Sequence, residues 1–73
     1  MHRLIQFFRY EHLPEPLKAP SRGCGLLARE IDAMLPESAE KTAGLRKLLE
    51  AKDCFVRACL DDLVASGRAP GSS

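Results

Sequence analysis

Aromatic and basic side chains are the residues of this sequence with the clearest capacity for chemistry. Tyr10 and His12 lie two positions apart near the N-terminus, and each combines a ring with a hydrogen-bonding atom. The basic residues most relevant to them are Lys18, Arg22, Lys41, Lys52 and Arg57. Arginine is suited to bidentate contact with phosphate, so the set is suited to binding an anion. The alternative for each cation is an ordinary solvated surface position.

No arrangement of nucleophile and base is visible in the sequence. The serines fall at expected helix ends and in the tail, and His12 has no evident partner. Asp61 and Asp62 are adjacent on an expected helix and therefore point in different directions. The three cysteines, which lack paired CxxC spacing, are Cys24, Cys54 and Cys59. We therefore expect no enzyme, no metal site and no cofactor, and we interpret the cysteines as small buried hydrophobes.

Length and charge limit the remaining classes. A chain of 73 residues forms one domain with a marginal core, so homo-oligomerisation is an expected source of extra stability. The net charge of +1 argues against a general polyanion binder, and we expect no DNA partner. No apolar run of about 18 residues occurs, and the first ten residues resemble neither a signal nor a transit peptide, so we expect no membrane partner.

The residues from 38 to about 65 predict a long amphipathic helix. Ser38 is its expected N-cap, and Glu40 lies in the first turn, where the helix dipole favours a carboxylate. The apolar positions recur at spacings of three, four or seven: Leu45, Leu48, Leu49, Phe55, Val56, Cys59, Leu60 and Leu63. This face is too wide for so short a chain to cover, so part of it is a predicted subunit interface. Lys52 interrupts the stripe, where it either reaches the rim and fixes register or contacts a bound anion.

The residues from 21 to 35 predict the first helix, with Ser21 as a possible N-cap. Its apolar positions are Cys24, Leu27, Ala28, Ile31, Met34 and Leu35. Gly23 and Gly25 indicate either close approach of another group or a frayed helix start. Because Leu35 precedes Pro36, the helix ends there, and so short a connection makes the two helices antiparallel neighbours.

The N-terminal 20 residues contain three prolines and three of the four aromatic residues. Pro14, Pro16 and Pro20 predict an extended or one-turn arm through about Tyr10, followed by a proline-rich connection. The predicted fold is thus all-α: an antiparallel helical hairpin with an extended aromatic N-terminal arm over residues 1–65, assembled as a homo-oligomer. Residues 66–73 are rich in Gly, Pro and Ser and are expected to be disordered.

Four short patterns carry a family resemblance that covers about residues 8–58. They are Phe8-x-Tyr10-x-His12-x-Pro14, Leu27-Ala28-x-x-Ile31-Asp32, Leu35-Pro36-x-Ser38-x-x-Lys41-Thr42 and Leu45-x-Lys47-Leu48-x-Glu50-Ala51. The ordered set resembles the small phage proteins whose helical hairpin serves as a cyclic-oligonucleotide sponge. Those proteins counter the bacterial CBASS and Thoeris defences.

The resemblance implies a homo-oligomer, typically a hexamer, in the cytoplasm of the infected bacterial host. It implies that cyclic dinucleotides, and in some members cyclic trinucleotides, are bound between protomers and are not cleaved. A tyrosine that stacks on a base maps onto Tyr10, and the accompanying candidates for ligand contact are Phe8, His12, Arg22, Lys52 and Arg57. The chain has Glu11 between Tyr10 and His12, where family members tend to have Tyr-His directly.

Two other functions remain open from the sequence. One is a small homo-oligomeric helical module that binds a protein through its uncovered helix face and has no nucleotide ligand. The other is a helical nucleic-acid-binding regulator, against which the near-neutral charge argues.

Overall fold

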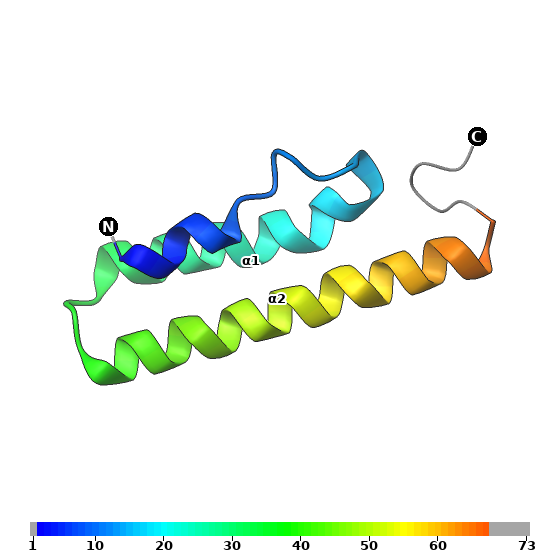
Figure 1. The fold of residues 1–73 in the computed structure, drawn as a ribbon. Helices are drawn as coiled ribbons and strands as arrows, with labels where there is room; N and C mark the ends of the chain where they lie inside the picture. Colours follow the sequence, from blue (N-terminus) through cyan, green and yellow to red (C-terminus); the bar gives the residue numbers. More distant parts are fainter. Residues whose placement is uncertain (1, 68–73) are drawn as a thin grey trace.

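The computed structural model describes residues 2–67 and shows two long helices packed as an antiparallel hairpin (Figure 1). The helices are α1, Glu15–Met34, and α2, Ala39–Ala65, and a 3-10 helix, η1, spans Arg3–Phe8. η1 lies along the hairpin and contacts both helices. The described part of the chain contains no strand, which confirms the predicted all-α hairpin. No helix in residues 2–67 is both long and apolar enough to cross a membrane.

The start of α2 lies where the sequence predicted it. The Ser38 hydroxyl accepts a hydrogen bond from the Lys41 backbone N–H at 3.0 Å, and Glu40 occupies the first turn. Both features satisfy the unpaired N–H groups and the positive dipole of a helix start. A local signal of cap and periodicity was therefore sufficient to place this element.

The end of α2 is an ordered turn. The Ser66 backbone N–H donates to the Asp62 carbonyl at 3.0 Å, and the Gly67 N–H donates to the Val64 carbonyl at 3.1 Å. Gly67 has φ +75°, the left-handed conformation that favours glycine after a helix. The expected disordered tail thus begins with a helix-terminating turn, and its residues 68–73 lie outside the described residues.

α1 begins at Glu15, earlier than the predicted start at Ser21. Pro16 lies in the first turn, where backbone N–H groups make no hydrogen bond within the helix, so the N–H that proline lacks is not needed. Pro20 cannot donate to the Pro16 carbonyl one turn earlier, but the Cys59 thiol of α2 donates to that carbonyl at 3.2 Å. The proline-rich segment is therefore helix rather than connection, and α2 supplies part of the reason.

The N-terminal segment is also helical. Residues 3–8 form the 3-10 helix instead of the expected extended or one-turn arm, and residues 9–14 connect it to α1. We refer to residues 2–14 as the arm. The core that joins the arm to both helices consists of Leu4, Ile5, Phe8, Ala28 and Leu45. Burial of these side chains against the hairpin fixes the path of the arm.

Several residues differ from their expected surroundings. Ser21 is not a helix cap but is fully buried inside α1, and its hydroxyl has no hydrogen-bond partner among residues 2–67. Cys54 is exposed, whereas Cys24 and Cys59 are partly buried, so the expectation of buried cysteines is wrong for Cys54. The buried positions of α1 are Leu17, Ser21, Gly25 and Ala28, of which only Ala28 belongs to the predicted stripe. Two further members of that stripe, Cys24 and Ile31, pack partly buried against the core.

A large apolar surface remains uncovered in the single chain. Met34 is 63% exposed and Phe55 is 53% exposed, and the other exposed large hydrophobic residues are Phe7, Leu26, Leu27, Leu35, Leu60 and Val64. The sequence placed three of these residues, Leu27, Met34 and Leu35, on the apolar face of the first helix. In the isolated subunit they are exposed and do not belong to the core. These exposures agree with the expectation that the chain cannot cover its own helix faces. Assembly into an oligomer stays a prediction.

The arm approaches α1 most closely at Gly25. A Cβ atom placed there would lie 2.9 Å from the Phe8 carbonyl oxygen and 3.7 Å from Cδ1 of Tyr10. At Gly23 nothing lies within 4 Å of the same position. Of the two glycines, Gly25 thus permits close approach of another backbone, which was one of the two interpretations of the sequence.

The two glycines give a matched pair of variants. Gly23→Ala should stabilise the protein by roughly 1 kcal/mol, because alanine favours a helix interior. Gly25→Ala gains the same propensity but displaces the arm, so it should be about 1–3 kcal/mol less stable than Gly23→Ala. Urea unfolding of both variants beside the wild type measures the difference. Equal stabilities of the two variants would contradict the tight contact at Gly25.

Candidate functional site

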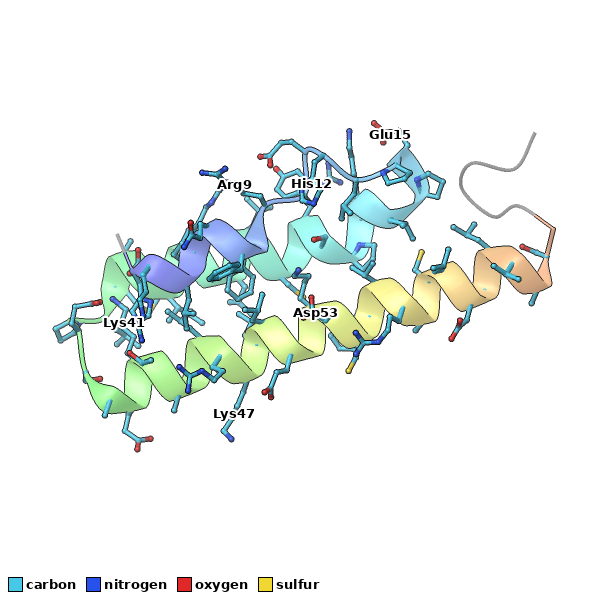
Figure 2. The ribbon with its side chains drawn as sticks, viewed as in Figure 1. Arg9, His12, Glu15, Lys41, Lys47 and Asp53 are labelled. Atoms are coloured by element: carbon cyan, nitrogen blue, oxygen red, sulfur yellow. The ribbon has the colours of Figure 1, made fainter. Side chains whose placement is uncertain are left out.

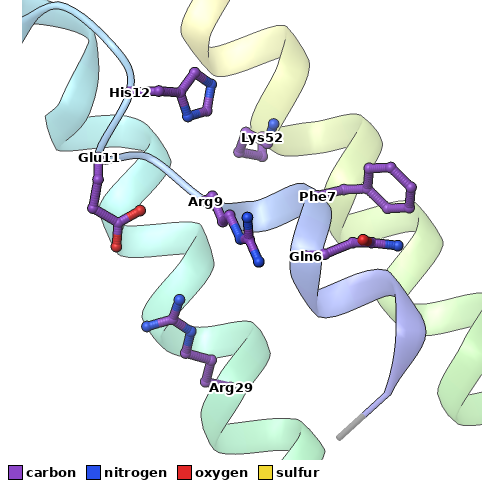
Figure 3. A pocket seen from close by; sticks show the side chains of 7 residues that line it. All are labelled: Gln6, Phe7, Arg9, Glu11, His12, Arg29 and Lys52. Atoms are coloured by element: carbon purple, nitrogen blue, oxygen red, sulfur yellow. The ribbon is translucent and has the colours of Figure 1, made fainter.

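An open hollow of about 780 Å³ lies where the arm crosses the hairpin (Figure 3). Every element contributes to its lining, which consists of Gln6, Phe7, Arg9, Glu11, His12, Arg29 and Lys52. We call it the basic hollow. Five of these residues belong to the arm, one to α1 and one to α2, so the hollow exists only while the arm is docked.

Positive charge dominates the basic hollow. Arg9 and Arg29 are exposed, and neither guanidinium makes an ion pair with another residue in the described part of the chain. The Lys52 ammonium lies 2.9 Å from the carboxylate of Asp53, its neighbour on α2. Free guanidinium groups next to a partly buried ammonium are suited to hold an anion.

Glu11 is the one carboxylate in the lining. Its pKa is lowered by hydrogen bonds from the backbone N–H groups of Glu11 and Tyr10, and by the nearby charges of Arg29 and Arg9. The Tyr10 N–H donates to Oε2 of Glu11 at 3.1 Å. Glu11 is thus ionised at neutral pH, and three cations against one carboxylate leave an excess of two positive charges in the lining.

The structure brings together two of the six residues predicted to contact a ligand. His12 extends from the arm toward Lys52 of α2 on one side of the basic hollow (Figure 3). Phe7 lies in the same lining and is 53% exposed. An exposed ring next to cations can contact an aromatic group of a bound anion.

Phe8 does not belong to this surface. It is 0% exposed and packs in the core, because η1 turns Phe8 inward and its neighbour Phe7 outward. The prediction that Phe8 contacts a ligand is therefore wrong for this structure. Its neighbour Phe7, which the sequence interpretation did not select, lines the basic hollow instead.

The other three predicted residues lie elsewhere. Tyr10 is partly buried, and its ring packs near Gly25 of α1. Arg22 is exposed on α1 but does not line the basic hollow. Arg57 is exposed on α2 and donates to the Cys54 sulfur at 3.4 Å. Ligand contact by these three residues stays a prediction, and it needs a surface other than the basic hollow.

The sequence interpretation missed Phe7, Arg9 and Arg29 as a set. A signal for Arg29 was present, because it follows Arg22 by seven residues and therefore shares a helix face with it. Arg9 lies directly before Tyr10, whereas Lys18 is the first of the basic residues that the sequence singles out. No local pattern shows that the arm carries Arg9 back to Arg29.

Two of the predicted cations are engaged in structural contacts. Lys18 pairs with Glu15 at 3.2 Å on the surface of α1. Lys41 is buried at the closed end of the hairpin, with 3% of its side chain exposed (Figure 2). Its ammonium lies 2.8 Å from the Asp32 carboxylate and also contacts the Glu37 carboxylate. Lys41 is therefore a structural residue rather than a ligand contact.

The start of the arm is fixed to the same closed end. The His2 backbone N–H donates to both carboxylate oxygens of Asp32, at 3.2 and 3.1 Å. The His2 ring accepts a hydrogen bond from the Leu4 N–H on Nδ1 at 3.1 Å, and its Nε2 lies 2.9 Å from the Thr42 hydroxyl. His2 thus links η1 to α1 and α2 at once and sets the position of the arm over the basic hollow.

No protein-family model, no curated protein and no solved structure matches this chain. The chemistry of the basic hollow therefore carries the functional argument. Its lining offers cations, hydrogen-bond donors and a ring, which together suit a small anion that carries an aromatic group.

Proposed function

We propose that this protein binds and sequesters cyclic di- or trinucleotide signals without cleaving them. The observation that carries the proposal is the convergence of Arg9, Arg29 and Lys52 beside the exposed ring of Phe7. The resemblance of residues 8–58 to phage sponges supports the same ligand class. On this proposal the protein counteracts a CBASS-type defence in the cytoplasm of an infected bacterium.

The chemistry of a cyclic oligonucleotide fits the basic hollow. Each phosphodiester carries one negative charge, which the free guanidinium groups of Arg9 and Arg29 can bind with charge-assisted hydrogen bonds. Base stacking on an aromatic side chain contributes about 1–3 kcal/mol per base. A volume of about 780 Å³ is adequate for part or all of such a ligand. Sequestration requires affinity alone, so no general base is needed.

We also propose that the protein acts as a homo-oligomer, and a hexamer is the state that the resemblance implies. The basic hollow is open on one side, and exposed apolar side chains such as Phe55 and Leu27 are available to pack against a second copy. A neighbouring subunit could close the hollow over the ligand. Tyr10, Arg22 and Arg57 are then candidates for contacts across the subunit boundary.

Native mass spectrometry with and without a mixture of cyclic dinucleotides and trinucleotides tests both proposals. We expect an oligomer whose mass increases by whole ligands, and we expect the same ligands to be recovered intact after denaturation. A protein that remains a monomer at high concentration contradicts the assembly. The absence of any bound ligand, together with no thermal shift across a broad ligand panel, contradicts the function.

The second candidate is a protein–protein interaction module without a nucleotide ligand. The exposed side chains of Phe55, Leu60 and Val64 along the C-terminal half of α2 favour it. This candidate predicts that the wild type binds no cyclic nucleotide, that Phe55→Glu abolishes capture of a partner protein, and that charge changes in the basic hollow leave this capture unchanged. Measuring partner capture and cyclic dinucleotide binding for both kinds of variant separates the two functions.

A further inference from the structure

The basic hollow depends on the arm, and the arm depends on His2. Five of the seven lining residues lie in residues 2–14, downstream of the His2 contacts. His2 is buried, so its ring is part of the packed structure rather than a surface group. Any change that breaks the ring contacts therefore acts on the whole lining of the hollow.

The hydrogen bonds define the protonation state of the His2 ring. The Leu4 backbone N–H can only donate, so Nδ1 must accept and carries no proton. The remaining proton of a neutral ring is then on Nε2, which donates to the Thr42 hydroxyl. A charged imidazolium would place an N–H at Nδ1 directly against the Leu4 N–H. The two ring contacts that hold the start of the arm thus require neutral His2.

The charged groups around His2 do not offset this conflict. From α1, Asp32 is engaged by the His2 backbone N–H and by Lys41, not by the ring. From α2 and the turn before it, Lys41 and Glu37 pair with each other, and Thr42 has no charge. Within residues 2–67 no carboxylate is hydrogen-bonded to the His2 ring, and Glu37, which interacts with His2 through its charge alone, is already paired with Lys41.

The same groups keep their charge through the range in which histidine titrates. Hydrogen bonds from Lys41 hold the pKa values of Asp32 and Glu37 below their ordinary values of 3.8 and 4.5. Hydrogen bonds to the same carboxylates hold the pKa of Lys41 above 10.5. These three side chains therefore keep their charges between about pH 5 and 8, which is the range in which an imidazole is the side chain that ordinarily changes charge.

We propose that His2 is a positioning residue that acts as an acid-sensitive latch for the arm. Neutral His2 docks the arm and completes the basic hollow, whereas protonated His2 releases the arm and weakens ligand binding. One proton is taken up for each arm that is released. Docking is therefore complete at higher pH and is lost as the pH falls. The effect on ligand binding rests on the proposed function, but the release of the arm does not.

Amide hydrogen exchange tests the latch directly in the full chain. In the wild type, the protection factors of the Leu4 and Ile5 amides should fall at least about tenfold between about pH 8 and pH 5, where histidine titrates. Protection factors are used because they remove the intrinsic pH dependence of exchange. The amides of α2 near Leu45 serve as an internal reference and should keep their protection.

Two variants separate the histidines. His2→Asn keeps a side chain that caps helices well but does not titrate, so the pH dependence at Leu4 should disappear. His12→Gln leaves His2 as the one histidine of the chain, so its ring titration can be followed by NMR without ambiguity. That titration should coincide with the loss of protection at Leu4. This readout needs no substitution at His2 and so remains valid if His2→Asn fails to fold.

The outcomes distinguish the latch from the proposed function. Constant protection at Leu4 while the His2 ring titrates would overturn the latch, and so would an equal loss of protection in His2→Asn. In the His12→Gln background, which removes the histidine that lines the basic hollow, cyclic dinucleotide affinity should weaken about fivefold from pH 8 to pH 5, and it should stay constant when His2→Asn is added. Release of the arm without binding of any cyclic nucleotide at either pH would support the latch and contradict the sponge.

Discussion

Arg29→Glu is expected to weaken the binding of a cyclic dinucleotide by about 100-fold or more, because one charge-assisted hydrogen bond is lost and a repulsive charge replaces it. In the lining of the basic hollow, three cations and one carboxylate become two of each. Arg29 is exposed on α1 and is not part of the core, so the fold should be unaffected. Isothermal titration calorimetry of the folded variant measures the effect.

Arg46→Glu is the matched control for this experiment. Arg46 is exposed on α2 and does not line the basic hollow, but its substitution changes the net charge of the protein by the same amount. We expect less than about a threefold effect on affinity, because an exposed distant charge is screened by salt. Equal losses in both variants would indicate nonspecific attraction. Binding that is unchanged in Arg29→Glu would place the ligand elsewhere, with Tyr10 and Arg22 as the next candidates.

Lys41→Met is expected to cause the largest loss of stability of any single substitution described above. The Lys41 ammonium satisfies the Asp32 carboxylate and donates to the backbone carbonyls of Leu35 and Asp32, at 2.8 and 3.2 Å. Methionine fills a similar volume but leaves the two part-buried carbonyls without this donor and the Asp32 carboxylate with the His2 backbone N–H alone. The melting temperature should fall by on the order of 10 °C. Circular dichroism during thermal unfolding measures it.

The control for Lys41→Met lies two turns along the same helix. Lys47 is exposed and points away from α1 (Figure 2), so Lys47→Met should change the melting temperature by no more than about 2 °C. A similar melting temperature for Lys41→Met and Lys47→Met would show that the closed end of the hairpin does not depend on the buried ammonium.

The ion pair between Lys41 and Asp32 predicts how the stability of the protein depends on pH. The Lys41 hydrogen bond, followed by that of the His2 backbone, lowers the pKa of Asp32 below 3.8. The contribution of Asp32 is therefore complete above the unfolded pKa and is lost as the pH falls through the lower pKa of the folded state. Acidification to about pH 2 should destabilise the wild type more than Lys41→Met, which has already lost this interaction. Thermal unfolding at pH 7 and at low pH compares them.

The helices were largely predictable because their signals are local. Ser38 as the cap of α2, the apolar periodicity of that helix and Pro36 between the helices lie within a few residues of the features they determine. The start of α1 was not predictable in the same way. Pro20 disfavours a helix locally, but the Cys59 thiol, which is distant in sequence, satisfies the carbonyl that Pro20 leaves free.

The candidate site was predictable only in part. Lys52 stood out because it interrupts an apolar stripe, and His12 because it lies in an aromatic segment, and both line the basic hollow. The signals for the two arginines were weaker, because Arg29 merely shares a helix face with Arg22, and an exposed arginine such as Arg9 on a connection is ordinary by itself. The role of His2 was invisible for the same reason, since its partners Asp32 and Thr42 lie 30 and 40 residues away.

The sequence by itself determined that this protein is an antiparallel helical hairpin with more apolar surface than one chain can cover. Helix caps, prolines and apolar periodicity act over a few residues, so their effects do not depend on the final packing. Only the tertiary structure decided which cations are free and which are structural. Docking of the arm brings Arg9 near Arg29 and Lys52, while burial commits Lys41 to Asp32. These outcomes depend on contacts between residues far apart in the chain, which no local pattern specifies.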